Sequence, residues 1–411
     1  MKLDSLYALL CSLSWPILVS ASPTVPSAKF VGAVYSITNE PSGNYILASG
    51  ISADGKLAFG SITHAGGIGS IGIDPTLPGD PLFSQGSVVV SSERDLLATV
   101  NGGSNTVALF KIDPSDPTHL TMVGKPVGSG GEFPTSVAFN MAGTVVCVLN
   151  GGAVNGVRCF DVDALKGLSV ITHTTKYLNL NETTPPSGPL GSVSQVIFAN
   201  KDKSLMVAVK GNPSVGARGY LAFWDFEHDG SLSKEYRTVF GNKAVHAPFG
   251  ITPVRGANAI LTADAALGYD IWDFTGSKGL AQDDWKITDY PVAGQAAICW
   301  STYSPKTGNY YLVDFKDVIT EVSVDCHADS HIVKQYNVTK GSFTLDTDIG
   351  TVKGNDYMYT LVSAVPGVLV HSIIAPGDMQ QIQVLNYSAP TKKAGIVAEL
   401  KALQGLAVYA K

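Results

Sequence analysis

The residues best suited to chemistry stand beside short apolar segments of the sequence. His246 comes just before Ala247-Pro248-Phe249, and Asp264 ends another such segment. An imidazole and a carboxylate can act together as general base and general acid. His246 could equally be a loop histidine bonded to the backbone, and both readings stay open. Arg218 and Lys210 flank a glycine-bounded loop, where they could hold an anionic ligand or simply face solvent.

A repeated unit must position these residues. One copy runs from Leu97 to Phe110 and the next from Val146 to Phe160. Each unit has an apolar strand, a turn, a second strand, a glycine-rich turn and a third strand ending in an aromatic residue. A fourth strand then leads into the next unit. Such units are typical of propeller blades, which bury both faces only within a ring. Seven units start near Ala33, Ser87, Thr135, Ser194, Phe249, Ala296 and Asp348.

The C-terminal tail has features that could complete such a ring. Ile396, Val397, Leu400 and Leu403 share one face of a helix, and residues 406 to 409 form a strand-like run. The tail either caps and closes the ring or is a loosely docked terminus. The predicted fold is all-β: a seven-bladed β-propeller of four-stranded antiparallel blades, with a short C-terminal helix. Residues 22–411 would form one domain.

Composition supports this fold and excludes other classes. The chain has 411 residues, of which 15% are charged and 45% hydrophobic, with 43 Gly and 22 Pro. It is too apolar to be disordered, and its Gly and Pro content favours short strands joined by tight turns. The formal net charge of −6 argues against a basic nucleic-acid surface, so we expect no nucleic-acid partner.

The N-terminus predicts export. Residues 1–21 resemble a secretory signal peptide, with Lys2, an apolar run and the small-residue site Val19-Ser20-Ala21. The alternative is a hydrophobic N-terminal strand. No later segment is long and apolar enough to predict a membrane span. We therefore expect a secreted, extracellular protein. Glycosylation is expected at three sequons, which begin at Asn181, Asn337 and Asn386.

Four cysteines remain after such a signal peptide. Cys147 and Cys159 lie in consecutive apolar runs joined by a glycine-rich turn. A hairpin would place them nearly opposite each other, so a disulfide is predicted in an oxidising compartment. Cys299 and Cys326 would then be a second pair by elimination only. The alternative is four buried free thiols.

The units resemble the lactonase family of seven-bladed β-propellers, which includes 6-phosphogluconolactonases and the fungal 3-carboxymuconate cyclase. The resemblance rests on Val100–Phe110, Pro134–Phe139, Ser194–Phe198 and the opening Ala33–Asn39 with Gly55-Lys-Leu57, and it covers nearly the whole mature chain. It implies a propeller fold and a site in the central channel. Secreted proteins of this kind are familiar from fungi.

The resemblance also implies which positions form that site. The muconate-type members use a His, two Arg and a Glu. The His falls on Ser194, with Gln195 retained. One Arg falls on Phe249, the Glu on Asp264, and the second Arg near Asp314. Because one acid is kept while the His and both cations are replaced, either the substrate differs or the ring is a binding scaffold.

Two functions follow from these residues. The first is a lactonase or cyclase acting on a small lactone or carboxylated ring compound at the central channel. Asp264 would be its acid/base, with Gln195 and His246 also in the catalytic set. The second is a non-catalytic extracellular propeller that binds carbohydrate or protein. Arg218, Ser194, Phe249, Asp314 and Trp300 would contact the ligand in the first case.

No cofactor or metal ion is indicated by sequence spacing. Cys326-His327 with His331 is better read as a loop than as a zinc site, and Gly67-Ile-Gly-Ser-Ile-Gly72 precedes Asp74-Pro75 rather than a helix. Metal ligands drawn from different strands of a ring would, however, show no characteristic spacing.

Overall fold

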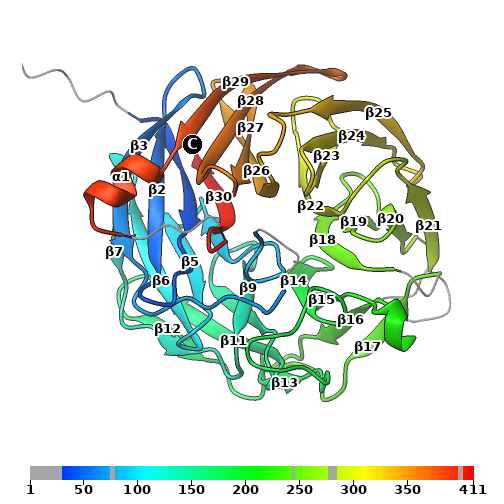
Figure 1. Ribbon diagram of the computed structural model, residues 1–411. Helices are drawn as coiled ribbons and strands as arrows, with labels where there is room; N and C mark the ends of the chain where they lie inside the picture. The colour runs from blue at the N-terminus through cyan, green and yellow to red at the C-terminus, as the bar shows by residue number, and fades with distance from the viewer. Residues whose placement is uncertain (1–29, 75–78, 243–245, 276–284, 397–400) are drawn as a thin grey trace, which may run out of the picture.

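The computed structural model describes residues 30–74, 79–242, 246–275, 285–396 and 401–411, whose strands form a ring of seven antiparallel sheets (Figure 1). We number these sheets as blades 1 to 7. In blades 1 to 6 the first strand is innermost, and the next three follow outward in sequence order; the short strands β8 and β13 pair with the third strands of blades 1 and 2. The innermost strands of neighbouring blades contact each other all around the ring.

The strand bounds of the first three blades follow. Blade 1 contains β4 (Val88–Ser91), β5 (Leu96–Asn101), β6 (Thr106–Asp113), β7 (Asp116–Met122) and β8 (Val127–Gly128). Blade 2 contains β9 (Pro134–Phe139), β10 (Val145–Asn150), β11 (Gly156–Asp163), β12 (Gly167–Val170) and β13 (Lys176–Tyr177). Blade 3 contains β14 (Val193–Ala199), β15 (Ser204–Val209), β16 (Tyr220–Asp225) and β17 (Arg237–Phe240).

The remaining blades complete the ring. Blade 4 contains β18 (Pro248–Pro253), β19 (Ala259–Asp264), β20 (Gly268–Asp273) and β21 (Lys286–Pro291). Blade 5 contains β22 (Ile298–Tyr303), β23 (Tyr310–Asp314), β24 (Val318–Val324) and β25 (Ser330–Asn337). Blade 6 contains β26 (Thr344–Val352), β27 (Asn355–Val362), β28 (Gly367–Ala375) and β29 (Asp378–Asn386). Blade 7 contains β30 (Gln404–Ala410), β1 (Gly32–Ile37), β2 (Tyr45–Ile51) and β3 (Leu57–His64).

The C-terminal strand closes the ring. β30 is the innermost strand of blade 7 and pairs antiparallel with β1, the first strand of the chain. The Tyr409 hydroxyl donates to Asp95 Oδ1 at 2.6 Å, and Lys411 also pairs with Asp95. The expected closing strand is therefore confirmed, and the unit at Ala33 begins with a second strand. The helix is short, α1 (Ser388–Lys393), and part of the predicted helical face lies outside the described residues.

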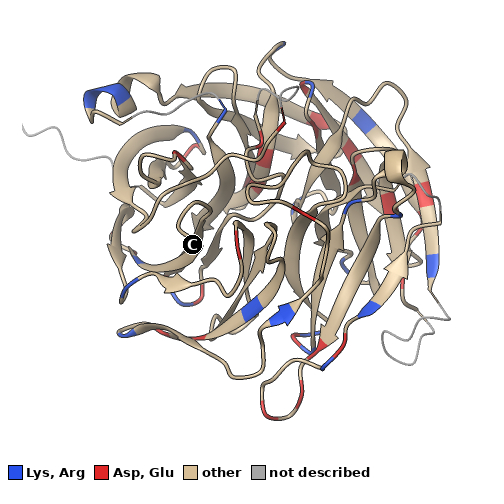
Figure 2. Ribbon diagram, turned by 60° about the horizontal axis from the view of Figure 1, so that its bottom comes forward, with Lys and Arg blue, Asp and Glu red and all other residues tan. Residues whose placement is uncertain are grey.

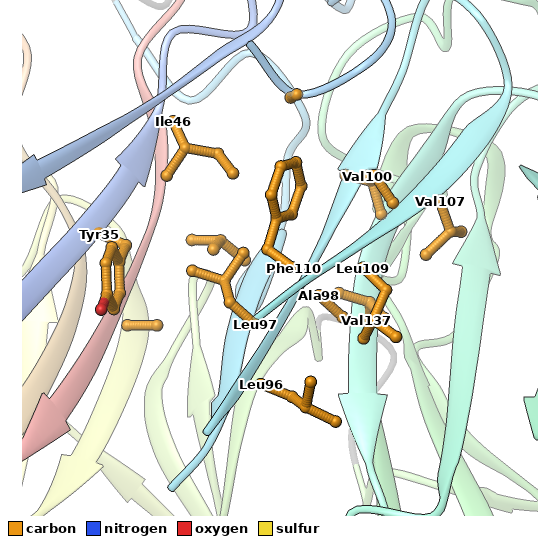
Figure 3. Close-up of a cluster of buried hydrophobic side chains, with 14 of the residues drawn as sticks. Tyr35, Ile46, Leu96, Leu97, Ala98, Val100, Val107, Leu109, Phe110 and Val137 are labelled. Carbon is orange, nitrogen blue, oxygen red and sulfur yellow. The ribbon is translucent and has the colours of Figure 1, made fainter. Parts of the chain in front are cut away.

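Apolar layers between blades explain why the middle strands are so hydrophobic. All six residues of β5 and of β15 are buried, because neighbouring blades cover both faces. Figure 3 shows Tyr35 and Ile46 of blade 7 facing Leu97 and Phe110 of blade 1. The outer strands instead mix buried and exposed positions, as in β29. The predicted propeller with seven four-stranded blades is thus confirmed.

The cysteines follow one prediction and depart from another. Cys147 and Cys159 are directly opposite on β10 and β11 and form a disulfide. Cys299 is buried at the start of β22, whereas Cys326 is exposed beyond β24, and both are free thiols. A Cys299–Cys326 pair is therefore wrong, because the first thiol lies inside the blade and the second in a peripheral turn.

The exposure of the sequon asparagines and the length of the helices bear on the predicted export. The three sequon asparagines are exposed: Asn337 and Asn386 are the last residues of the outermost strands β25 and β29, and Asn181 follows β13. No described helix is long and apolar enough to cross a membrane. The predicted signal peptide lies outside the described residues. In the view of Figure 2 the Lys and Arg positions are interspersed with Asp and Glu.

Candidate functional site

The centre of the ring contains a cavity of about 280 Å³, which we call the channel pocket. The innermost strands of blades 1 and 3 to 7 form its wall. Its lining residues are Gln85, Gly86, Val88, Val89, Val90, Gln195, Ile251, Thr252, Pro253, Ser301, Thr302, Tyr303, Asp346, Thr347, Asp348, Leu406, Ala407 and Val408.

One end of the channel pocket is closed by residues 79–87, which we call the plug segment. It crosses the axis and binds blades on opposite sides of the ring. The Ser84 Oγ donates to the Thr135 carbonyl at 2.8 Å, and the Ser84 carbonyl accepts from Trp300 Nε1 at 3.1 Å. Gln85 Nε2 donates to the Ser301 carbonyl at 2.9 Å. Gln85 and Gly86 thus form the floor of the pocket.

A buried lysine, Lys210, anchors the plug segment. Lys210 Nζ donates to the carbonyls of Phe83, at 2.7 Å, and Val193, at 2.6 Å, and lies over the Phe249 ring. Burial lowers the pKa of Lys210, and the charge of Asp80 opposes that change. Burial likewise raises the pKa of Asp80. Lys210 therefore holds the plug segment in place and does not line the pocket.

The pocket opens at the opposite face, where the innermost strands end. Along β18, Pro248 to Gly250 are buried while Pro253 is exposed, and β22 likewise changes from buried to half-buried at Tyr303. Asp348 and Val408 are half-buried at similar depth. A small ligand would therefore enter from the face where these strands end.

Two carboxylates from β26 line the pocket. Asp346 and Asp348 are two residues apart on one strand, and both face the pocket. Asp346 Oδ2 accepts the backbone N–H groups of Gly86, at 3.2 Å, and Leu406, at 3.3 Å. Asp348 Oδ2 accepts the N–H of Val408 at 2.9 Å. The carboxylates are thus held by the plug segment and by the closing strand.

The surroundings of the two carboxylates give them different pKa values. Burial, with a contribution from the charge of Asp348, raises the pKa of Asp346 to about 8 despite its bonds to backbone N–H groups. Burial raises the pKa of Asp348 to about 6. Near neutral pH Asp348 is therefore mainly ionised, while Asp346 retains its proton. Such a separated pair is the usual arrangement for acid and base roles.

The other polar groups of the wall are uncharged. The Thr252 and Ser301 hydroxyls are 2.7 Å apart. Gln195 Oε1 accepts the N–H of Ile251 at 2.5 Å. Gln195 Nε2 lies close to Gly86, 3.8 Å from the position that a Cβ on this glycine would take. Among the lining residues that the structure describes, none is Lys, Arg or His. The pocket therefore carries negative charge without a compensating cation.

A common rule explains several of these contacts. The inner edge of each innermost strand has backbone N–H groups that no further strand can accept. Gln195, Asp346 and Asp348 each use a side-chain oxygen to accept such an N–H from the next blade, and Ser136 Oγ accepts that of Val196 at 3.2 Å. Gln195 therefore links blades 3 and 4 in addition to lining the pocket.

The predicted acid/base residues lie away from the pocket. His246 and Asp264 are 0% exposed and sit within blade 4, where His246 Nδ1 lies 3.1 Å from Asp264 Oδ2 and 3.2 Å from Asp270 Oδ2. Burial disfavours the imidazolium, but its bonds to the two carboxylates outweigh burial and raise the pKa of His246 to about 10. A histidine that is already protonated is not available as a base near neutral pH.

The predicted ligand-contacting residues are also placed elsewhere. Ser194 is buried and donates to the carbonyls of Pro248 and Phe249. Phe249 and Trp300 pack against each other in the core, with ring centroids 5.4 Å apart. Asp314 accepts backbone N–H groups, including that of Ala296 at 2.7 Å. Arg218 is exposed and donates to the Gly241 carbonyl. Of the predicted site residues, only Gln195 lines the pocket.

The fold of this chain is similar to that of several solved structures. A Bacteroides fragilis protein is similar over 94% of this chain and 99% of its own, with 11% identity and a TM-score of 0.59. A Bacteroides uniformis protein matches 87% of this chain and 97% of its own, with 13% identity and a TM-score of 0.59. Both are described as a "putative 6-phosphogluconolactonase". The periplasmic gluconolactonase of Pseudomonas aeruginosa matches 71% of this chain and 82% of its own, at 11% identity and TM-score 0.56.

Sequence comparison adds no closer relative. No protein-family model matches the chain, and no curated protein matches it. At identities of 11–13% the structural likeness establishes the fold alone.

Proposed function

We propose that the protein hydrolyses a small, uncharged lactone in the channel pocket. The observation that carries this proposal is the pair of channel carboxylates, Asp346 and Asp348, whose pKa values are raised to about 8 and about 6. One of them can accept a proton near neutral pH while the other remains protonated. The lactonase-like fold of the structural neighbours is consistent with this chemistry.

Hydrolysis assigns one task to each polar group. Asp348 accepts a proton from a water molecule as the water oxygen bonds to the lactone carbonyl carbon. The Gln195 amide and the Thr252 or Ser301 hydroxyl donate to the carbonyl oxygen as it becomes negative. The ring C–O bond then breaks, and the proton held by Asp348 passes to the leaving alkoxide. Water and lactone are thus converted into a hydroxy acid.

The charge of the pocket selects the substrate. A lactone without phosphate or carboxylate groups meets no repulsion, whereas a tricarboxylate would face Asp348 with no lining Lys or Arg. The carboxymuconate-type reaction is therefore disfavoured. The carboxyl group of the hydroxy acid product is ionised at neutral pH. Repulsion between this carboxylate and Asp348 would aid product release.

The pH profile of hydrolysis provides one prediction. Asp348 is active once ionised, so kcat/KM should rise through a pKa near 6. Asp346 adds a second negative charge beside the developing oxyanion once it ionises, so kcat/KM should fall through a pKa near 8. We therefore expect a bell-shaped profile with an optimum between these values, measured as kcat/KM for an uncharged sugar lactone. A profile that is flat from pH 5 to 9, after correction for spontaneous hydrolysis, would refute the assignment.

Charge selection provides a second prediction. A phosphorylated sugar lactone should be hydrolysed with a kcat/KM at least about tenfold below that of its unphosphorylated counterpart, because phosphate and Asp348 repel each other. The comparison is made at low and at high salt, since screening should narrow the difference. Preference for the phosphorylated lactone would contradict the proposed substrate class.

A binding role without catalysis is the second candidate. Gln195, Thr252, Ser301 and Tyr303 offer hydroxyl and amide groups that suit a polyhydroxylated carbohydrate. Calorimetric binding of a sugar, combined with no turnover of any lactone in a panel, would favour this role over the enzyme.

We also propose that the mature chain begins at residue 22, folds as one domain and is secreted with glycans. The signal-like N-terminus, the Cys147–Cys159 disulfide and the exposed sequon asparagines support this. N-terminal sequencing and glycosidase treatment of protein secreted by a eukaryotic host would test it; retention of residues 1–21 would contradict it.

A further inference from the structure

Blade 4 contains a buried group of potential metal ligands that the proposed hydrolysis does not use. His246 precedes β18, Asp264 ends β19 and Asp270 lies on β20. One ligand atom from each residue lies within 4.8 Å of the other two, and all three residues are 0% exposed. Two carboxylates this close must share a proton or a cation, because burial opposes two adjacent negative charges.

The hydrogen bonding of Asp270 is incomplete. Its Oδ2 accepts from Thr262 Oγ1 at 3.3 Å and lies 3.2 Å from His246 Nδ1. Its Oδ1 is buried and has no hydrogen-bond partner. A buried carboxylate oxygen without a donor is unfavourable in a protein interior. This oxygen is therefore available to a cation. A metal ion bound there would replace the proton that His246 Nδ1 shares with the two carboxylates.

The second nitrogen of His246 has a carboxylate nearby. His246 Nε2 lies 3.4 Å from Asp289 Oδ1, on the outer strand β21. Histidines that bind a metal through one nitrogen usually direct the other N–H to a carboxylate, which fixes the ring. Asp289 lies on that side of the His246 ring, although Nε2 makes no hydrogen bond in this geometry. Nδ1 is turned towards Asp264 and Asp270.

We propose that His246 Nδ1, Asp264 Oδ2 and both oxygens of Asp270 bind one divalent transition-metal ion of the Zn²⁺ or Mn²⁺ class. One imidazole and two carboxylates suit these ions, whereas Ca²⁺ prefers oxygen ligands throughout. Ligands about 2.1 Å from such an ion lie roughly 3.0–3.4 Å apart. The Nδ1–oxygen separations of 3.1 and 3.2 Å agree with that spacing. The ion would join β19 and β20 to the segment before β18.

Metal content and thermal stability test this site in the full chain. Tag-free protein is stripped with a chelator, incubated with ZnCl₂ or MnCl₂, desalted and analysed by elemental mass spectrometry and thermal melting. We expect about one ion per chain and a higher Tm with the metal, because binding favours the folded state. The Co²⁺ form should show visible absorption typical of mixed nitrogen and oxygen ligands.

Variants localise the ion. Asp270→Asn should lower metal affinity at least about tenfold and remove the Tm response, whereas Asp273→Asn, on the same strand, should retain both. Equal metal content in wild type and a folded Asp270→Asn variant would place the ion elsewhere, for example on exposed His327 and His331, and overturn the proposal. If the variant does not fold, the wild type still decides: no retained metal and no Tm response would show that protons alone hold the cluster.

Discussion

Asp348→Asn should lower kcat/KM for an uncharged lactone by about 10²- to 10⁴-fold, the usual contribution of a general base. The asparagine side chain keeps an oxygen that can accept the Val408 N–H, now 2.9 Å from Asp348 Oδ2. It cannot accept a proton from water. Because it is also neutral, the substitution introduces no buried charge, and the Tm should change little. Steady-state kinetics with matched thermal melts measure both quantities.

Two further substitutions show where the chemistry occurs. Asp264→Asn removes the acid that the family resemblance predicts to be catalytic, but Asp264 is 0% exposed and lies outside the channel pocket. The kcat/KM of Asp264→Asn, calculated per folded molecule, should stay within a few-fold of wild type. Asp378→Asn, in the same blade as Asp348, is the control for loss of an acid. Full activity in Asp348→Asn, with loss in Asp264→Asn, would reverse the assignment.

Deletion of residues 404–411 should prevent stable folding. The deletion removes β30, the innermost strand of blade 7, and leaves the inner edge of β1 unpaired. It also removes the buried side chains of Leu406, Ala407 and Tyr409. Their burial is worth on the order of 5 kcal/mol, comparable to the whole stability of many domains. We expect insoluble protein or loss of the cooperative melting transition.

Deletion of Lys411 alone is the matched control. Lys411 pairs with Asp95, but both side chains are partly exposed, so the pair should contribute under about 1 kcal/mol. The shorter deletion should therefore melt within a few degrees of wild type. A soluble chain lacking residues 404–411 with a wild-type Tm would show that the ring does not depend on closure by β30.

The fold was readable from the sequence because each blade repeats the same local pattern. The predicted unit starts at Ser87, Thr135 and Ser194 are within about one residue of β4, β9 and β14. The Cys147–Cys159 disulfide followed from hairpin register in the same way. The last unit was placed at Asp348, although β26 begins at Thr344, because its polar residues hide the usual apolar onset.

The site was harder to predict because it depends on contacts between blades. Asp346 and Asp348 form an Asp-x-Asp pattern, and acids at alternate positions of an innermost strand were the available signal. Burial raises their pKa values, while N–H groups from the plug segment and from β30, both distant in sequence, hold the carboxylates in place. The plug segment also buries the face that holds Ser194 and Phe249, and nothing in its own sequence indicates that it crosses the axis.

A crystal structure with an uncharged sugar lactam, in which an amide replaces the ring ester, tests most directly where the ligand binds. The lactam resists hydrolysis and keeps the shape and neutrality of the proposed substrate. We expect the lactam to occupy the channel pocket, with its ring carbonyl near Gln195 and with Asp348 beside the carbonyl carbon. Density for the lactam beyond the plug segment, against His246 and Asp264, with the channel pocket empty, would contradict it.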